Sequence, residues 1–171
     1  MDDLVSIPDL GNALIKLHNF DVELAERADL VIYSHRDLRD AIASMQRMFN
    51  VAPKLEIAEH LISQDAKWRK VADYVMRYED FLVCPENILS GLCDLFGIKD
   101  LDISSINAKL NALSFDSSGE KNIRYNYQNL YHQGHVTNGK EGAWKGQLSE
   151  DFVALLERNY GDWFVSNGYV I

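Results

Sequence analysis

Hydrophobic and polar positions follow two patterns along this chain, and together they predict strands separated by helices. Short runs rich in branched apolar side chains, at residues 13–17, 30–34 and 73–77, are typical of strands, and the middle run is the clearest. Apolar positions spaced three or four residues apart predict helices at residues 24–27, 37–49, 55–70, 85–96, 104–113 and 149–165. Strands that alternate with helices indicate an α/β fold: a parallel sheet with flanking helices.

Residues with strong local preferences set several of the helix ends. Pro85 suits the first turn of a helix, and Gly97 suits the position just after one. Ser149 is a good N-cap, and it is followed by two acidic residues that the helix dipole favours. Residues 115–139 show no regular pattern, which predicts a long functional or disordered loop.

Arg36 stands where the strand at 30–34 gives way to the next helix. Ligands of open α/β sheets bind beyond the carboxyl ends of strands, and a guanidinium offers a planar fork of donors for phosphate. The hydroxyl of Ser44 lies eight residues further on, about 12 Å along a helix axis, so one phosphate would reach both only if the loop at Arg36 folded back. The alternative is that Arg36 pairs with the aspartates of its own helix, Asp37 and Asp40, while Ser44 is simply packed.

This segment resembles a known phosphate-binding element. The order of a strand, then Arg36-Asp37-Leu38-Arg39-Asp40, then Ser44 is similar to the 3′-phosphate site of sulfotransferases that use 3′-phosphoadenosine 5′-phosphosulfate. The resemblance implies a P-loop sulfotransferase-like fold in which Arg36 and Ser44 bind the 3′-phosphate. Arg39, one turn along the helix, is expected to face solvent.

Three further segments resemble the same family in the same order. Leu14-Ile15-Lys16-Leu17-His18 resembles a strand ending in Lys-Thr-His, whose histidine is the general base, which makes His18 the catalytic candidate. Tyr78-Glu79-Asp80-Phe81 resembles a strand end at which the tyrosine, here Tyr78, contacts adenine. Gly139-Lys140-Glu141-Gly142-Ala143-Trp144-Lys145 resembles a cofactor-binding loop, which adds Gly139 and Lys140 to the nucleotide site. A terminal Gly168-Tyr169 also matches, so the resemblance spans residues 13–169.

The chain departs from the family in two places. The Pro-Lys-Ser-Gly-Thr-Thr-Trp phosphate loop that binds the 5′-phosphosulfate has no match here, so the chain is expected to lack the first phosphate-loop strand. The family's Arg-Lys pair before the loop glycine is replaced by Thr137 and Asn138. The chain therefore resembles the latter two-thirds of a sulfotransferase, and we expect weak or no binding of 3′,5′-diphosphoadenosine.

Several candidate residues also have ordinary structural interpretations. His18 could instead be a strand-end histidine bonded to backbone, and Trp144 is expected to anchor its loop. Glu79 and Asp80 are expected to be structural. His132 and His135 lack partners at metal-ligand spacing, so no metal site is predicted.

Composition bounds the remaining classes. The 171 residues fit one domain, here 1–171, and no apolar run reaches the ~20 residues of a membrane span. A net charge of −9 opposes binding to nucleic acid or to an anionic membrane. Cys84 and Cys93 lack metal-ligand spacing and are expected to be reduced thiols, which suggests a cytoplasmic protein.

Two classes of function remain open. The first is an enzyme that transfers a sulfuryl group to a hydroxyl or amine of a small-molecule or saccharide acceptor. The second is a non-catalytic sulfotransferase remnant or interaction protein, or a fragment that needs a missing N-terminal segment or partner. An unfilled strand position predicts an exposed apolar edge and homo-oligomers. A nucleotide kinase is a weaker third possibility, because its phosphate loop is equally absent.

Overall fold

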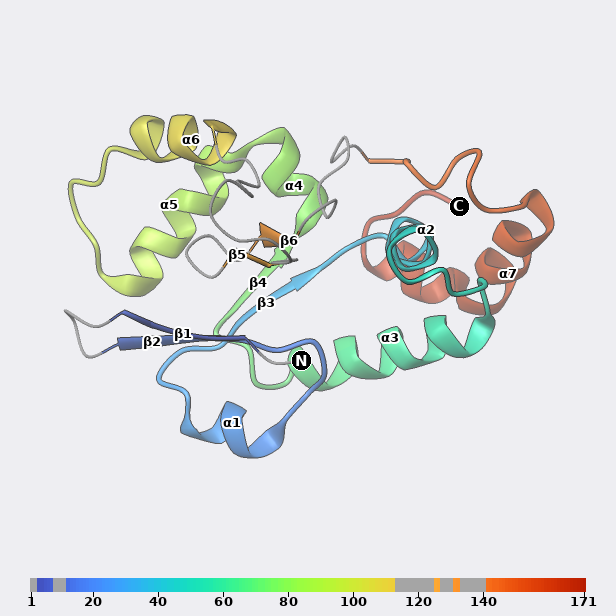
Figure 1. Cartoon of the computed structure of the whole chain (residues 1–171), viewed down its shortest axis with the longest axis horizontal. Helices are drawn as coiled ribbons and strands as arrows, with labels where there is room; N and C mark the ends of the chain where they lie inside the picture. The colour runs from blue at the N-terminus through green and yellow to red at the C-terminus, as the bar shows by residue number, and fades with distance from the viewer. Residues whose placement is uncertain (1–2, 8–11, 113–124, 127–130, 133–140) are drawn as a thin grey trace.

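The structure is a computed structural model that describes residues 3–7, 12–112, 125–126, 131–132 and 141–171. Two parallel strands, β3 (Ile32–His35) and β4 (Tyr74–Arg77), lie at its centre, with helices on either side (Figure 1). In their register Ile32 pairs with Tyr74 and His35 with Arg77. The prediction of a parallel sheet with flanking helices is therefore confirmed in its coarse form, with two parallel strands among the described residues.

The helices fall into two groups around these strands. The crossover from β3 to β4 contains α2 (Leu38–Phe49) and α3 (Leu55–Trp68), and α7 (Glu150–Ser166) packs against α3. On the other side lie α4 (Tyr78–Val83), α5 (Pro85–Phe96) and α6 (Ile103–Ala112). The short α1 (Val22–Arg27) leads from the N-terminal hairpin towards β3. Among the described residues no helix is both long and apolar enough to cross a membrane.

The strand predicted at 13–17 is observed, but its partner differs from the one expected. β2 (Asn12–Lys16) pairs with β1 (Asp3–Ile7) in an antiparallel hairpin, with Leu4 opposite Ile15, and it does not join the parallel pair. A short connection is enough to join antiparallel neighbours, whereas a parallel neighbour needs a long crossover. Local pairing with β1 therefore replaces the expected place in the parallel sheet.

Two further differences concern elements that the sequence pattern did not reveal. Helix α4 follows β4 without a loop, because the backbone at Arg77 is still extended and the next residue is already helical. Strands β5 (Tyr125–Asn126) and β6 (Tyr131–His132) form a short antiparallel pair within the stretch predicted to be irregular. Most of that stretch, including His135, Thr137 and Asn138, lies outside the described residues.

Local side chains set several helix ends, as predicted at Pro85, Gly97 and Ser149, while Asp37, expected in the first turn of its helix, instead caps it. The Asp37 carboxylate accepts the backbone N–H of Arg39 at 2.8 Å and so caps α2. Pro85 begins α5, and Gly97, with φ of 65°, ends it in the left-handed conformation that favours glycine. Ser149 caps α7 by accepting the N–H of Phe152 at 3.3 Å.

The buried core lies where α2, α3 and α7 meet, to one side of the parallel strands (Figure 1). Its members are the side chains that face one another across these helices and from the segments flanking α7: Leu38, Ile42, Ala43, Ala58, Leu148, Val153, Leu156, Phe164 and Tyr169. Since only the N-cap Asp37 separates Arg36 from α2, this core fixes the position of the strand end that carries the candidate site.

Candidate functional site

Arg36 and Tyr78 lie side by side at the carboxyl ends of the two parallel strands. The register pairs His35 with Arg77, the last residues of the two strands, so Arg36 and Tyr78 are the residues that follow each strand. The guanidinium carbon of Arg36 is 4.8 Å from the centroid of the Tyr78 ring, a cation–π arrangement. The structure therefore brings together two of the residues that the sequence assigned to one nucleotide site.

The guanidinium of Arg36 has unused hydrogen-bonding capacity. Its Nε–H is buried and has no hydrogen-bond partner among the described residues. Its Nη2 lies 3.9 Å from the Asp40 carboxylate, which is a loose ion pair, and 27% of the side chain is exposed. Because buried donors are rarely left unsatisfied, this group is a candidate to bind an oxyanion.

Asp40 connects this strand end to a distant part of the chain. Its carboxylate is fully buried and accepts the backbone N–H of Gly142 at 2.9 Å and that of Trp144 at 2.8 Å. Burial raises the pKa of Asp40 above its usual value, although the two amides oppose the shift. The segment that contains Gly142 and Trp144 is thus held on α2 beside Arg36. Gly139 and Lys140, the loop residues predicted to bind cofactor, lie outside the described residues.

Glu79 holds the turn that carries Arg36. It is 2% exposed, and its carboxylate accepts the backbone N–H of Asp37 at 3.0 Å and the hydroxyl of Tyr169 at 3.1 Å. Arg77 approaches the same carboxylate through its Nε at 3.4 Å. Asp80, in contrast, is largely exposed. These contacts agree with the structural role predicted for Glu79.

Arg39 does not face solvent, so that prediction was wrong. Its side chain is buried, bonds the carboxylates of Asp37 and Glu157, and donates to the carbonyl of Val170. Its guanidinium also lies over the Trp144 ring at 4.8 Å. The reason is helical spacing: Arg39 shares a face with core residues three and four positions further on.

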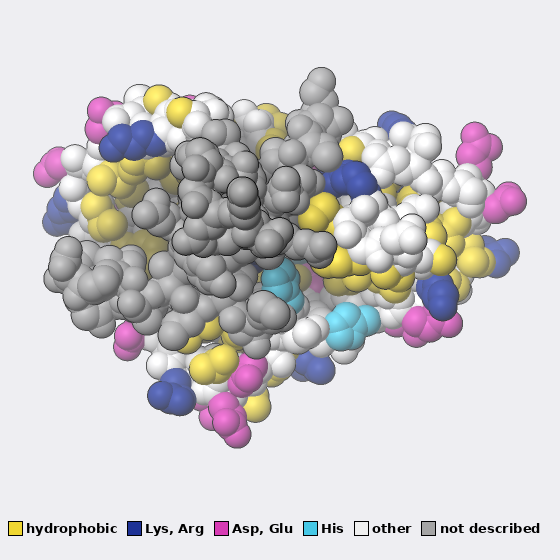
Figure 2. Space-filling model, viewed as in Figure 1, with side chains coloured by type: hydrophobic (Ala, Val, Ile, Leu, Met, Phe, Trp, Pro, Cys, Tyr) yellow, Lys and Arg dark blue, Asp and Glu magenta, His cyan; other side chains and the backbone are white. Residues whose placement is uncertain are grey.

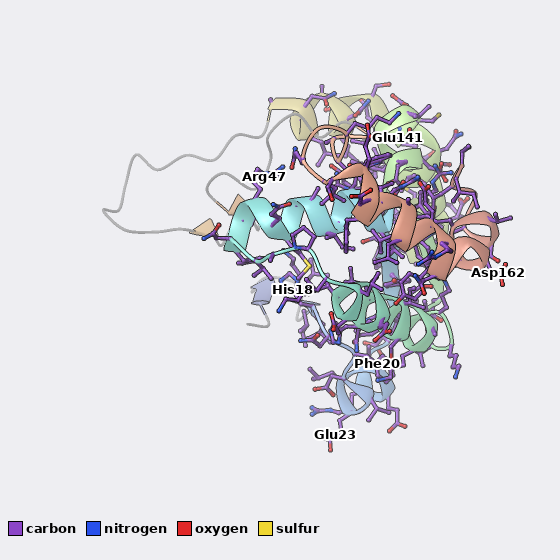
Figure 3. The ribbon with its side chains drawn as sticks, turned by 90° about the vertical axis from the view of Figure 1, so that its right-hand side faces the viewer. His18, Phe20, Glu23, Arg47, Glu141 and Asp162 are labelled. Carbon is purple, nitrogen blue, oxygen red and sulfur yellow. The ribbon has the colours of Figure 1, made fainter. Side chains whose placement is uncertain are left out.

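Ser44 lies further along α2, towards the end of the helix that is remote from Arg36. Its hydroxyl accepts a hydrogen bond from Nη2 of Arg47 at 3.4 Å. Figure 3 shows Arg47 and Glu141 at opposite ends of this helix, and Glu141 belongs to the segment beside Arg36. The structure thus gives Arg36 and Ser44 different partners.

His18 is exposed in the segment that leads from β2 to α1 (Figure 3). The two residues after it are held on α3. Asn19 contacts the His60 ring at 3.1 Å, and Phe20 donates its backbone N–H to Gln64 and packs edge-on against Trp68. These contacts fix the His18 segment to α3, whereas Arg36 and Tyr78 are fixed by β3, β4 and α4.

His35, which directly precedes Arg36, is a half-buried histidine that the sequence analysis did not single out. Its Nδ1 lies 3.3 Å from the Tyr169 hydroxyl, and its ring stacks on Tyr33. Burial lowers the pKa of His35, and the positive charge of Arg69 contributes to the shift. The alternation of Tyr33 and His35 along β3 was the available signal, because alternate strand residues face the same side.

One face of the molecule carries a mixture of charges. On the face drawn in Figure 2, the described Lys and Arg side chains are scattered among acidic ones and form no continuous basic patch. Within the part of the chain that the structure describes, no group of His, Cys, Asp and Glu is arranged to hold a metal ion. On this face, the candidate for binding an anion is therefore a local group such as Arg36 and not a broad basic surface.

No protein-family model, no curated protein and no solved structure matches this chain.

Proposed function

We propose that this chain is a sulfotransferase-like domain whose nucleotide site is built on Arg36 and Tyr78. The observation that carries the proposal is the Nε–H of Arg36, which has no hydrogen-bond partner among the described residues and is held beside the Tyr78 ring where two parallel strands end. In this proposal Arg36 binds the 3′-phosphate of 3′-phosphoadenosine 5′-phosphosulfate, or of the product 3′,5′-diphosphoadenosine. The Tyr78 ring faces the adenine.

The proposed reaction transfers a sulfuryl group to a hydroxyl or amine of a small-molecule or saccharide acceptor. The sulfur–oxygen bond to the 5′-phosphate breaks, a sulfur–oxygen or sulfur–nitrogen bond to the acceptor forms, and the acceptor proton passes to a base, for which His18 is the candidate. Charge that develops on the leaving phosphate needs donors aimed at it. No segment of the 171 residues has the phosphate-loop pattern. The reaction would therefore need these donors from residues arranged differently from a phosphate loop, or from a partner chain.

A second candidate, a non-catalytic interaction protein with a sulfotransferase-like frame, is favoured by the arrangement of acidic groups. Asp40, in the first turn of α2, already approaches the Arg36 guanidinium that would bind phosphate. Ser44 is engaged with Arg47. In such a protein the strand end is a structural feature, and it binds no nucleotide.

Calorimetric titration with 3′,5′-diphosphoadenosine separates these candidates. We expect saturable but weak binding by this chain, with a dissociation constant above about 1 μM, because the charge-assisted bonds of a phosphate loop are worth about 1.5–3 kcal/mol each. Adenosine 5′-phosphate, which lacks the 3′-phosphate, should bind more weakly still. If neither compound shows saturation at millimolar concentration, the nucleotide proposal is wrong and the interaction protein stands.

Arg36→Lys tests the residue assignment within the same titrations. Lysine keeps the charge but not the planar fork, so the preference for the 3′-phosphorylated compound should fall. Arg158→Lys, an exposed residue on α7, is the matched control and should leave both affinities unchanged. Arg39 is unsuitable as a control because it is buried in ion pairs.

We also propose a cytoplasmic location, because both cysteines are free thiols. A global net charge of −9 fits partners other than nucleic acid and anionic membranes.

A further inference from the structure

Asp40 receives two hydrogen bonds from residues more than a hundred positions further along the chain. We infer that Asp40 is a positioning residue: its carboxylate fixes the segment around Gly142 and Trp144 against Arg36 and thereby sets the geometry of the anion site. The effect that we expect on nucleotide binding rests on the proposed function. The structural part of the inference stands on contacts that do not depend on a ligand.

The two oxygens of Asp40 have different partners. Oδ1 accepts the N–H of Trp144 at 2.8 Å, and Oδ2 accepts the N–H of Gly142 at 2.9 Å. An ionised carboxylate has acceptors on both oxygens, whereas an asparagine would turn an NH₂ group towards one of these amide donors. The attachment therefore requires a carboxylate and not merely a small polar side chain.

The same Oδ2 atom also faces Arg36. It lies 3.9 Å from Nη2 of the guanidinium, so one oxygen is shared between the Gly142 amide and the proposed phosphate-binding group. A shift of Gly142 would change how much of this negative charge is available to Arg36. The position of the segment and the readiness of Arg36 to bind an anion are thus linked through one atom.

A second contact ties this segment to the other strand. Glu141 lies 3.9 Å from Nη2 of Arg77, which precedes Tyr78 directly. The segment consequently spans from α2, which follows Arg36, to the end of β4, which leads into Tyr78. It is placed to hold the two halves of the site at a fixed separation.

Asp40→Asn is the direct test, with Asp162→Asn as the matched control. Asp162 is exposed on the outer side of α7 and lies away from Glu141 (Figure 3). The Asp40 variant should shift the backbone amide signals of Gly142 and Trp144 and the side-chain Nε–H signal of Arg36 in nuclear magnetic resonance spectra. The control variant should leave all three signals in place.

Gly142→Ala provides a second variant that leaves Asp40 itself intact. Gly142 has φ of 75°, which alanine adopts only with strain, but the added methyl would meet nothing closer than the Lys145 side chain at 3.8 Å. The variant therefore disturbs the segment through its backbone alone. If Asp40 acts by holding this segment, Gly142→Ala should also shift the Arg36 Nε–H signal.

The binding measurement uses 3′,5′-diphosphoadenosine and adenosine 5′-phosphate on the full chain. We expect Asp40→Asn to reduce the preference for the 3′-phosphorylated compound about tenfold, the factor that corresponds to 1.4 kcal/mol. Removing the loose 3.9 Å ion pair would by itself favour an anion at Arg36, and we expect the loss of the attached segment to outweigh that effect. A merely destabilised protein would weaken both compounds equally and leave the ratio unchanged, which would overturn the positioning role.

The spectra keep this inference separate from the proposed function. If the parent chain binds neither nucleotide, the proposed function fails, and the positioning role is decided by the Arg36 signal alone. Unchanged Arg36 signals in both Asp40→Asn and Gly142→Ala would overturn it, and shifts in both would support it.

Discussion

Around the strand ends, single buried side chains hold together segments that are far apart in the sequence. Glu79 joins the start of α2, the end of β4 and the C-terminal Tyr169 through one carboxylate. Burial raises the pKa of the Tyr169 phenol, and the neighbouring Glu79 carboxylate contributes. The hydroxyl therefore stays protonated and can donate to Glu79 across the ordinary pH range.

Glu79→Gln should destabilise the protein by about 1–3 kcal/mol, because a charged acceptor of three donors is replaced by a neutral group. Urea denaturation measures the change, with Asp162→Asn as a control expected within about 0.5 kcal/mol of the parent. Tyr169→Phe should cost less, since it removes one donor. If the two losses simply add in the double variant, the Glu79–Tyr169 contact does not contribute as described.

Asp40 should make stability depend on pH in a defined direction. Its pKa in the folded protein is raised above the ordinary 3.8, so the folded state retains this proton more tightly than the unfolded state. The contribution of this proton to the free energy of unfolding is fully present below the ordinary pKa. It is lost as the pH rises through the raised pKa of the folded state. Asp40→Asn should remove this part of the dependence.

The measurement is the free energy of unfolding in urea at a series of pH values from about 4 upwards. The difference in unfolding free energy between the parent and Asp40→Asn should change steadily between the ordinary pKa and the raised pKa of Asp40. Above the raised pKa it should be constant. A difference that is constant throughout would show that Asp40 titrates alike in both states.

Among the elements, α5 and β4 meet at an unusually close contact. A Cβ added at Gly91 would lie 2.6 Å from the Tyr74 hydroxyl oxygen and 3.0 Å from a ring carbon. Helix propensity alone would favour alanine over glycine inside α5 by about 1 kcal/mol. Gly91→Ala should nevertheless destabilise the protein, because the Tyr74 ring has to move. In a Tyr74→Leu background the same change should become neutral or stabilising, and thermal denaturation of the four proteins tests this.

How far sequence predicts an element depends on where its information lies. Helix α5 was predicted with both ends correct because Pro85 and Gly97 act locally on the backbone. The strand β2 was predicted from its own apolar residues, but its partner β1 could not be, since pairing depends on a second segment. The prediction for Arg39 was wrong because its helical spacing to Ile42 and Ala43 places it on the buried face of α2.

The candidate site shows the same division. The adjacency of Arg36 and Tyr78 was predictable, because both follow strands whose ends meet in a parallel pair. The resemblance implied that the loop at 139–145 belongs to the same site as Arg36, but it did not predict the bonds of Gly142 and Trp144 to Asp40 or that of Tyr169 to Glu79, which join residues distant in sequence. The positions of Gly139 and Lys140 stay predictions.

For the whole molecule, the parallel pair is small and partly uncovered. Ile32 on β3 and Val75 on β4 are each 38% exposed, although parallel strands are normally covered on both faces. We predict that the protein self-associates through these strands. Sedimentation should show an apparent molecular mass that rises with protein concentration. Ile32→Lys should reduce this rise. Val83→Lys, at an exposed position on α4, is the control, and a parent that stays monomeric at high concentration contradicts the prediction.

The bond between Glu79 and Tyr169 has a consequence for synthesis on the ribosome. The turn before Asp37 is held by Glu79, and Glu79 is in turn held by a residue 90 positions later. Contacts between such distant residues form late, and chains emerge at only about 5–20 residues per second. The strand end that carries Arg36 therefore waits several seconds for its last support. During that interval the nascent chain exposes the unfinished core between α2 and α3, which is when we expect it to depend most on chaperones.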